Sequence, residues 1–221
     1  MTPDERIDEY IAAHTTPGHE SLARIERRVN LRSSYPRMCS GHVQGRVLAM
    51  LSAMIAPRKV LEIGTFAGYS ALCLAEGMPD DDCRLHTIEI DDEMESFIRE
   101  NLASSPYGSR AEKGSNAWFD MDAADILPRL AAEAPFDLAF IDGNKRTYRE
   151  TFYQVLPLMR PGGFILADNT LWSGKVVADP PAADPQTRGI LDFNDAVAAD
   201  PRLETVILPL RDGLTLVRVK P

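Results

Sequence analysis

The residues best suited to hold a ligand lie between positions 62 and 70, directly after a short apolar run. This segment, E-I-G-T-F-A-G-Y-S, combines an acidic residue, two glycines and a hydroxyl. Glycines in a loop that follows a strand let a ligand approach the backbone closely. The spacing differs from the G-x-G-x-x-G of dinucleotide sites and from the phosphate-binding G-K-S/T loop. An acid at the strand end favours a cationic or amine-bearing ligand without phosphate, such as S-adenosylmethionine.

A second acidic residue, Glu89, ends the next predicted strand. In open α/β sheets ligands bind beyond the carboxyl ends of the strands, where a carboxylate can accept both hydroxyls of an adenosine ribose. The same position would serve a nicotinamide cofactor, so Glu89 indicates an adenosine ligand rather than one compound. The alternative is that Glu89 and the acids at 91 and 92 cap the following helix. We expect the ribose role.

Two further strand ends carry Asp142 and the pair Asp168-Asn169. Two carboxylates and an amide on adjacent strand tips are hard oxygen ligands that suit Mg²⁺, Ca²⁺ or Mn²⁺, and both segments lack the histidines that favour zinc. Taken alone, Asp-Asn after a strand is more often a turn or a helix cap. Paired carboxylates repel each other without a cation, which favours a metal site.

Lys145 lies close after Asp142, so its amine can project toward the same cleft. A neighbouring cation favours the neutral form of a lysine, which makes Lys145 a candidate general base. An isolated lysine is usually only a solvated surface residue. The position beside the predicted cation ligands is what favours the catalytic role.

The elements that must position these residues follow an alternating order. β-like runs at 59–63, 85–90, 137–141 and 163–167 are separated by helical stretches near 70–76, 92–103, 123–133 and 147–159. This order predicts a parallel sheet with helices on both faces, and the runs 204–209 and 213–219 predict an antiparallel C-terminal edge. We therefore expect one Rossmann-like, doubly wound, mostly parallel α/β domain over 1–221, with extra N-terminal helices within 1–56. The segment 104–121 has no clear period, and no conformation is predicted for 172–195.

The composition limits the partners of the chain. Its 221 residues, 44% of them hydrophobic, can bury one substantial core. A net charge of −9 disfavours nucleic acid and anionic membranes. Three cysteines without a C-x-x-C pair predict reduced thiols. The charged N-terminus is unlike a signal peptide, and no apolar run approaches about 18 residues. These features predict a cytoplasmic protein without a membrane partner.

The chain resembles the cation-dependent class I O-methyltransferases, the family of caffeoyl-CoA and catechol O-methyltransferases and their small bacterial relatives. The resemblance runs from about residue 36 to 220 and rests on ordered motifs: M-C-S-G-H-V-Q-G (38–45), V-L-E-I-G-T-F-A-G-Y-S (60–70), H-T-I-E-I (86–90), F-I-D-G-N-K-R-T-Y (140–148), R-P-G-G-F-I-L-A-D-N-T-L-W-S-G-K-V (160–176), D-P-R (200–202) and L-P-L-R-D-G-L-T-L (208–216). The glycine loop alone indicates only a methyltransferase, whereas the full series is highly specific.

The resemblance implies a role for each matched position. The residues implied to bind S-adenosylmethionine are Met38, Ser40, Glu62, Gly64, Phe66, Gly68, Ser70, Glu89, Asp122, Ala123 and Asp142. Among these, the loop holds the methionine part, Glu89 holds the ribose, and the pair at 122–123 lies beside the adenine. The implied cation ligands are Asp142, Asp168 and Asn169; Lys145 and Asp142 are implied to be catalytic, and Asn144 and Trp172 to contact the acceptor.

One departure from the family pattern concerns the acceptor. The usual D-A-D-K is D-G-N-K at 142–145 here, so the amide of Asn144 replaces a carboxylate. Asp142 and Lys145 remain, and we expect the cation and the base to remain with them. The lost charge is expected to alter the choice of acceptor.

The predicted reaction is methyl transfer to a hydroxyl of a catechol-like small molecule whose two neighbouring hydroxyls chelate the cation. One alternative is methylation of a hydroxylated tRNA base, against which the net charge weighs. A dehydrogenase is opposed by the loop spacing, and a third alternative is a non-catalytic protein that binds an adenosine ligand. The resemblance also implies a homodimer, built by the helices of 1–56, which cover the acceptor.

Overall fold

A computed structural model of the chain describes residues 3–112, 117–118, 123–179 and 184–221. A seven-stranded sheet lies at the centre, in the order β3-β2-β1-β4-β5-β7-β6. The strands are β1 (Lys59–Ile63), β2 (Arg84–Ile88), β3 (Ala117–Trp118), β4 (Phe136–Ile141), β5 (Met159–Asp168), β6 (Leu203–Leu208) and β7 (Leu214–Val219). β3, β2, β1, β4 and β5 pair in parallel, and β7 runs antiparallel to both β5 and β6. The predicted fold class is confirmed, with β7 inserted between β5 and the edge strand β6.

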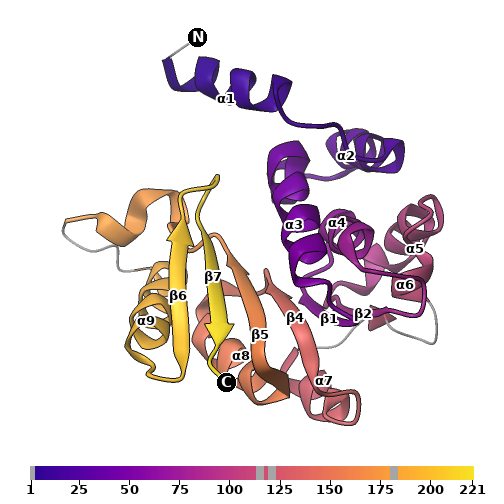
Figure 1. Cartoon of the computed structure of the whole chain (residues 1–221). Coiled ribbons are helices and arrows are strands. Elements are labelled where there is room, and N and C mark those ends of the chain that lie inside the picture. The colour runs from indigo at the N-terminus through magenta and orange to yellow at the C-terminus, as the bar shows by residue number, and fades with distance from the viewer. Residues whose placement is uncertain (1–2, 113–116, 119–122, 180–183) are drawn as a thin grey trace.

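Helices cover both faces of this sheet (Figure 1). They are α1 (Pro3–Ala13), α2 (Glu20–Arg32), α3 (Gly41–Ile55), α4 (Tyr69–Gly77), α5 (Glu95–Ala103), α6 (Ser109–Glu112), α7 (Ala123–Leu130), α8 (Tyr148–Val155) and α9 (Pro185–Ala199). Short 3₁₀ helices occur at Pro36–Met38, Asp92–Met94, Lys145–Thr147, Leu156–Leu158 and Trp172–Val177. Figure 1 shows α1 extending away from the body of the chain.

Two hydrophobic clusters hold these layers together, because successive strand residues point to opposite faces of the sheet. Val60 and Phe140 belong to the first cluster, which includes buried residues of α2, α3, α4 and α5. Leu61 and Ile141 belong to the second, which includes α7, α8 and α9. Strands buried on both faces read as nearly continuous apolar runs, which explains why their sequences predicted them well.

Two regions without a predicted element contain regular structure. α6 and β3 lie within 104–121, and α9 begins within 172–195 and ends just beyond it. α9 begins with ordinary helix-start signals: Asp184 accepts a hydrogen bond from the Thr187 N–H at 3.0 Å, and Pro185 occupies the first turn. These signals could have placed α9 from the sequence. The helix predicted at 147–159 ends earlier, at Val155, because a 3₁₀ helix and the long strand β5 follow.

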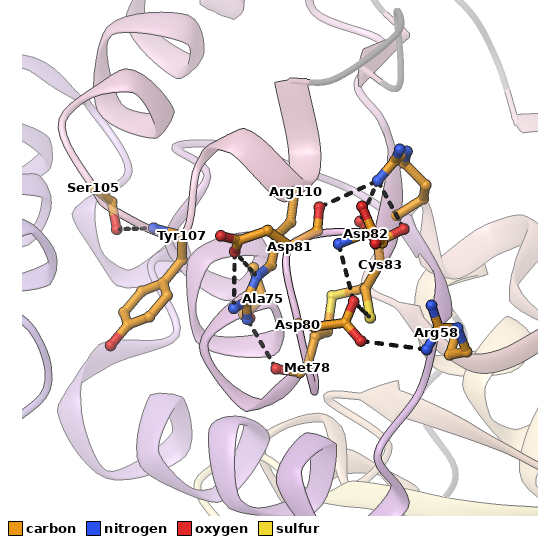
Figure 2. Close-up of polar contacts among 11 residues, drawn as sticks. Arg58, Ala75, Met78, Asp80, Asp81, Asp82, Cys83, Ser105, Tyr107 and Arg110 are labelled. Atoms are coloured by element: carbon orange, nitrogen blue, oxygen red, sulfur yellow. Dashed lines mark hydrogen bonds and ion pairs between the residues drawn. The ribbon is translucent and has the colours of Figure 1, made fainter.

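Arg110 ties α6 to the C-terminal end of α4 (Figure 2). Its guanidinium donates hydrogen bonds to the carbonyls of Ala75 and Met78, the second at 2.9 Å, and its Nε donates to Asp81 at 3.2 Å. The last carbonyls of a helix lack partners within the helix, so a buried arginine stabilises that end. This contact fixes α4, whose first turn follows the glycine loop.

Two expectations from composition concern thiols and membranes. Cys39, Cys73 and Cys83 are free, buried thiols in the structure, as predicted. Within the described ranges, no helix has the length and apolar character needed to cross a bilayer.

Candidate active site

The loop after β1 forms one wall of the site. Gly64 has a left-handed backbone (φ 95°), and its N–H donates to the Ile88 carbonyl at 3.0 Å. A Cβ at Gly64 would lie 2.3 Å from the carbonyl oxygen of Asp142, so only glycine fits. Phe66 (φ 50°) and Gly68 (φ 77°) are also left-handed, and they turn the chain sharply into α4. The loop therefore lies directly against the end of β4.

Glu62, the fourth residue of β1, is fully buried beneath this loop. The Thr87 hydroxyl donates to its Oε2 at 2.5 Å, while Oε1 is buried with no hydrogen-bond partner among the described residues. Burial raises the pKa of Glu62 to about 8, and the nearby carboxylates of Asp142 and Glu89 act in the same direction. A buried carboxyl with a free oxygen can bind an amine or ammonium group. Such a group supplies the hydrogen-bond donor that the buried oxygen lacks.

Glu89 follows β2 and lies against the glycine loop. Its Oε2 accepts a hydrogen bond from the Phe66 N–H at 2.6 Å, and its Oε1 accepts one from the Asp91 N–H at 3.0 Å. The cap of the following 3₁₀ helix comes from Asp91, which accepts from the Glu93 N–H at 3.1 Å. Asp91, and not Glu89, therefore caps the following helix. The Glu89 carboxylate lies at the strand end next to the loop.

A small hollow opens between this loop and the segment before α3. Six predicted cofactor residues contribute to its lining: Met38, Ser40, Gly64, Phe66, Ser70 and Asp142. Ser40 and Ser70 are buried, whereas Met38 is 57% exposed. The structure thus brings together residues from the loop, the cover segment before α3 and the end of β4.

The predicted adenine pair is only partly described. Asp122 lies outside the described residues. Ala123 is the first residue of α7 and is partly buried against the second hydrophobic cluster.

The second wall is formed by the ends of β4 and β5, which pair in parallel with Ile141 opposite Ala167. Asp142 follows β4, and its Oδ1 accepts a hydrogen bond from Lys145 Nζ at 2.8 Å. Lys145 is only 7% exposed, and its Nζ lies 4.5 Å from the centre of the Tyr148 ring. A carboxylate on one side and an aromatic face on the other hold the amine at the strand end.

Asp168 ends β5 on the adjacent strand and is 3% exposed. Its Oδ2 accepts from Gln44 Nε2 at 2.6 Å, and its Oδ1 accepts from the Asn169 N–H at 2.8 Å. Burial, together with the charge of Asp142, raises the pKa of Asp168 to about 6. Two neighbouring carboxylates repel each other, and a hard cation bound between them would remove that repulsion.

The donor set of this wall fits a divalent cation with oxygen ligands. Among the residues that the structure describes, no group of three His, Cys, Asp or Glu side chains forms a metal site. The predicted set differs in kind, because it combines the carboxylates of Asp142 and Asp168 with the amide residue Asn169. Asn169 has a left-handed backbone (φ 60°), which asparagine tolerates better than most residues.

With this geometry in view, the comparisons with known proteins identify the family. The sequence profile of the O-methyltransferase family matches residues 12–220. The chain belongs to the O-methyltransferase family. It is 32% identical over 224 residues to a catechol O-methyltransferase of Niastella koreensis, covering 98% of this chain and 97% of the relative. It is 33% identical over 251 residues to caffeoyl-CoA O-methyltransferase 1 of Eucalyptus globulus, covering 98% of each.

A solved structure agrees with this assignment. The O-methyltransferase TomG of Streptomyces achromogenes, involved in tomaymycin synthesis and crystallised with S-adenosylmethionine, superposes with a TM-score of 0.88, at 30% identity and over 100% of both chains. The resemblance predicted from the motifs is therefore confirmed, and so is the enzyme class, an O-methyltransferase. The dehydrogenase and non-catalytic alternatives are not supported.

Two residues predicted to meet the acceptor of this O-methyltransferase have other contacts. Asn144 is exposed, and its Oδ1 accepts from the Arg146 N–H at 3.1 Å, which caps the 3₁₀ helix that carries Lys145. Aspartate can make the same cap, so the change from carboxylate to amide keeps the local structure. Trp172 is partly buried against the second cluster, and its indole nitrogen is buried without a partner among the described residues.

Three residues of the methyltransferase site were not predicted. The Tyr148 hydroxyl shares its one proton between the carbonyls of Ile141 (2.6 Å) and Asp168 (2.7 Å), which joins the ends of β4 and β5. Gln44 contacts Asp168, and Arg211 contacts Gln44 in turn at 3.1 Å. All three lie inside the motifs that carry the family resemblance, so their polar character within those motifs was the available signal.

Proposed function

We propose that this chain is an S-adenosylmethionine-dependent and divalent-cation-dependent methyltransferase for a small molecule with neighbouring hydroxyls. The observation that carries the proposal is the contact between the two walls. Asp142 lines the hollow of the glycine loop, and its carboxylate pairs with Lys145 on the strand end next to Asp168. A methyl donor in the loop would then lie beside an acceptor held at the strand ends.

The loop wall is proposed to hold the cofactor. Glu62, with its free buried oxygen, would bind the ammonium group of the methionine part, and Ser70 would donate to its carboxylate. Glu89 would accept the ribose hydroxyls. The S-adenosylmethionine complex of TomG supports this use of the same fold.

The strand-end wall is proposed to hold a divalent cation, Mg²⁺ in the first place, through Asp142, Asp168 and Asn169. Bound there, the cation supplies a positive charge that lowers the pKa of a nearby acceptor hydroxyl and disfavours the charged form of Lys145. The raised pKa of Asp168, caused by burial and by Asp142, supports a site that gains from such a charge.

Lys145 then acts as the general base. Its Nζ accepts the proton of the acceptor hydroxyl, and the resulting oxyanion attacks the methyl carbon of the sulfonium. The oxygen–carbon bond forms as the sulfur–carbon bond breaks, and the cofactor leaves as a neutral thioether. Holding both reactants in line can remove up to about 7–11 kcal/mol of the barrier in ideal cases.

The acceptor is proposed to be a catechol-like compound. The similarity to a catechol O-methyltransferase and to a caffeoyl-CoA O-methyltransferase supports this class of acceptor. A hydroxylated tRNA base is the alternative acceptor, and the net charge of −9 weighs against it.

A homodimer is proposed from the exposed apolar side chains of the N-terminal region. Most of the large apolar side chains exposed in the described residues belong to 1–56: Ile7, Tyr10, Ile11, Leu31, Tyr35, Met38, Met50 and Met54. Exposed apolar side chains in such number indicate an interaction surface. Light scattering should give about twice the 24.5 kDa mass of one chain. Substituting both Met50 and Met54 by Glu should reduce the measured mass to that of a single chain.

The test is a methyl-transfer screen with S-adenosylmethionine across catechols, hydroxycinnamoyl esters and hydroxylated tRNA. We expect turnover with a catechol or ester, lost in excess chelator and restored by Mg²⁺. Asp168→Ala should lose cation-dependent turnover and retain binding of S-adenosylhomocysteine in calorimetry. Full activity in excess chelator would refute the cation, and turnover with tRNA alone would refute the small-molecule acceptor.

A further inference from the structure

The turn between β6 and β7 carries an arginine that reaches across to the site. Arg211 Nη1 donates hydrogen bonds to the carbonyls of Ser40 and Cys39, the second at 3.1 Å. The same nitrogen donates to Gln44 Oε1 at 3.1 Å, and Nη2 donates to the Arg37 carbonyl at 3.3 Å. One guanidinium therefore holds the backbone of 37–40, which covers the cofactor hollow, and also a side chain that contacts Asp168.

The contact with Arg211 decides which way the Gln44 amide faces. An arginine can only donate hydrogen bonds, so the amide oxygen of Gln44 must point toward Arg211. The amide NH₂ then points toward Asp168, whose carboxylate accepts it at 2.6 Å. Gln44 is 1% exposed, so no bulk water competes for either end. Without the arginine the amide could reverse and set its oxygen against the carboxylate, which is an unfavourable pair of acceptors.

The turn that carries Arg211 is itself held against the segment that follows the predicted cation ligands. The Leu171 N–H donates to the Asp212 carbonyl at 2.8 Å, and the Thr170 N–H donates to the Gly213 carbonyl at 3.1 Å. Arg211 also has a left-handed backbone (φ 50°), which is uncommon for a residue other than glycine. A residue held in that conformation by its surroundings indicates a placement that serves a site.

We propose that Arg211 is a positioning residue for methyl transfer, which fixes the cofactor cover directly and the Asp168 carboxylate through Gln44. The proposal rests on the proposed function, because it assigns the two ends of one arginine network to the cofactor and to the cation. It predicts that the two effects of Arg211 can be separated. The effect on the cation passes through Gln44, whereas the effect on the cofactor does not.

The test uses the full chain with Arg211→Lys, Gln44→Met and the double variant. Binding of S-adenosylhomocysteine is measured by calorimetry without metal, and binding of Mn²⁺ by electron paramagnetic resonance with saturating S-adenosylhomocysteine. Lysine keeps the charge but cannot supply the arginine fork, so both affinities should fall about tenfold in Arg211→Lys. Gln44→Met should weaken Mn²⁺ binding by a similar factor and leave S-adenosylhomocysteine binding within about twofold.

The double variant decides the proposal. Its Mn²⁺ affinity should equal that of Gln44→Met alone, while its S-adenosylhomocysteine affinity should equal that of Arg211→Lys. Additive losses in Mn²⁺ binding would overturn the path through Gln44. Arg218→Ala is the matched control, because Arg218 lies on the same hairpin and pairs with the exposed Glu204 at 3.0 Å; its two affinities should match the wild type.

A stability-only role for Arg211 predicts a different result. In that case Arg211→Lys would lower the melting temperature and leave both affinities of the folded variant within twofold of wild type, which would overturn the proposal. If the wild type itself bound neither S-adenosylhomocysteine nor Mn²⁺, the proposed function would fail together with this inference. Wild-type binding with unchanged variants would overturn this inference alone.

Discussion

The cofactor loop and the strand-end wall touch each other, yet they are held differently. The side chains that hold the loop are near it in the sequence, whereas the strand-end wall is held by a residue far away in the sequence. The loop is held by Glu89, which binds the Phe66 N–H from 23 residues away, and Glu62 is held by Thr87, 25 residues away. Asp168 is held by Gln44 from a distance of 124 residues. The first wall is thus assembled within one β-loop-α-β unit, whereas the second needs most of the chain to be folded.

The two walls also differ in how their acids are buried. Glu62 is fully buried with a free oxygen, and burial alone is the largest cause of its raised pKa. Asp168 has both oxygens hydrogen-bonded, and the charge of Asp142 adds to the effect of burial. Glu62 has one oxygen without a donor, whereas both oxygens of Asp168 have donors. The first arrangement suits an ammonium group, and the second suits a metal ion.

Removing the proposed base should have the largest effect and should affect one wall only. In Lys145→Met, kcat should fall by about 10²–10⁴-fold, because a positioned general base contributes that much. Calorimetry should give wild-type affinity for S-adenosylhomocysteine. Lys59→Met is the control, since Lys59 begins β1 and donates to the Glu133 carbonyl at 2.6 Å, away from the site. A loss of less than tenfold in kcat would show that another group takes the proton.

Gly64→Ala should damage both walls at once, because Gly64 is where they meet. The added Cβ would lie 2.3 Å from the Asp142 carbonyl oxygen, on a backbone with φ 95°. Urea unfolding should show a loss of about 3 kcal/mol, from overpacking and backbone strain together. Gly174→Ala is the matched control, with φ 73° and nothing within 4 Å of the new Cβ, and it should lose only about 1 kcal/mol. Equal losses in the two variants would mean that the walls separate easily.

The same difference between the walls explains what the sequence could predict. The glycine loop and Glu89 lie at strand ends that the apolar runs reveal, and the local spacing of loop residues is sufficient to propose their ligand. β1 is found at the predicted residues 59–63 because a strand buried on both faces has a continuous apolar sequence. Asp142, Asp168 and Lys145 are likewise found at strand ends that they were predicted to share.

The supports of the second wall could not be predicted in the same way. Gln44 lies in the helix α3, where a glutamine is ordinarily a surface residue, whereas in the folded chain it is buried with its amide between Asp168 and Arg211. Arg211 lies in a turn, and nothing local indicates that it reaches the carbonyls of 37–40. Asn144, by contrast, makes a local contact, the cap of the Lys145–Thr147 helix, and its predicted role toward the acceptor stays a prediction. Contacts between distant segments depend on the fold and leave no spacing in the sequence.

The acid of the cofactor wall should give the cofactor-free protein a distinct pH dependence. The pKa of Glu62 is about 8 in the folded protein, against a model-compound value of 4.5. The folded state therefore binds the Glu62 proton more tightly than the unfolded state does. The contribution of this proton to the free energy of unfolding is complete below pH 4.5 and is lost as pH rises toward 8. In urea unfolding, Glu62→Gln should gain about 3–4 kcal/mol relative to wild type between pH 5 and pH 8. A difference for Glu62→Gln that stays constant over this pH range would refute the buried, protonated acid.

Tyr148→Phe should have the smallest effect and should again be confined to one wall. The Tyr148 hydroxyl joins the carbonyls of Ile141 and Asp168. Without it, both buried carbonyls lose this hydrogen-bond donor. Urea unfolding should show a loss of about 1–2 kcal/mol, and turnover should fall several-fold as the strand ends separate, with the affinity for S-adenosylhomocysteine unchanged. Tyr153→Phe is the matched control, because its hydroxyl donates at 3.3 Å to Ala196 and Asp200 at a partly exposed position; it should lose under about 0.5 kcal/mol. A weaker cofactor affinity in Tyr148→Phe would mean that the strand ends also support the loop, and that the two walls are less independent than their hydrogen bonds indicate.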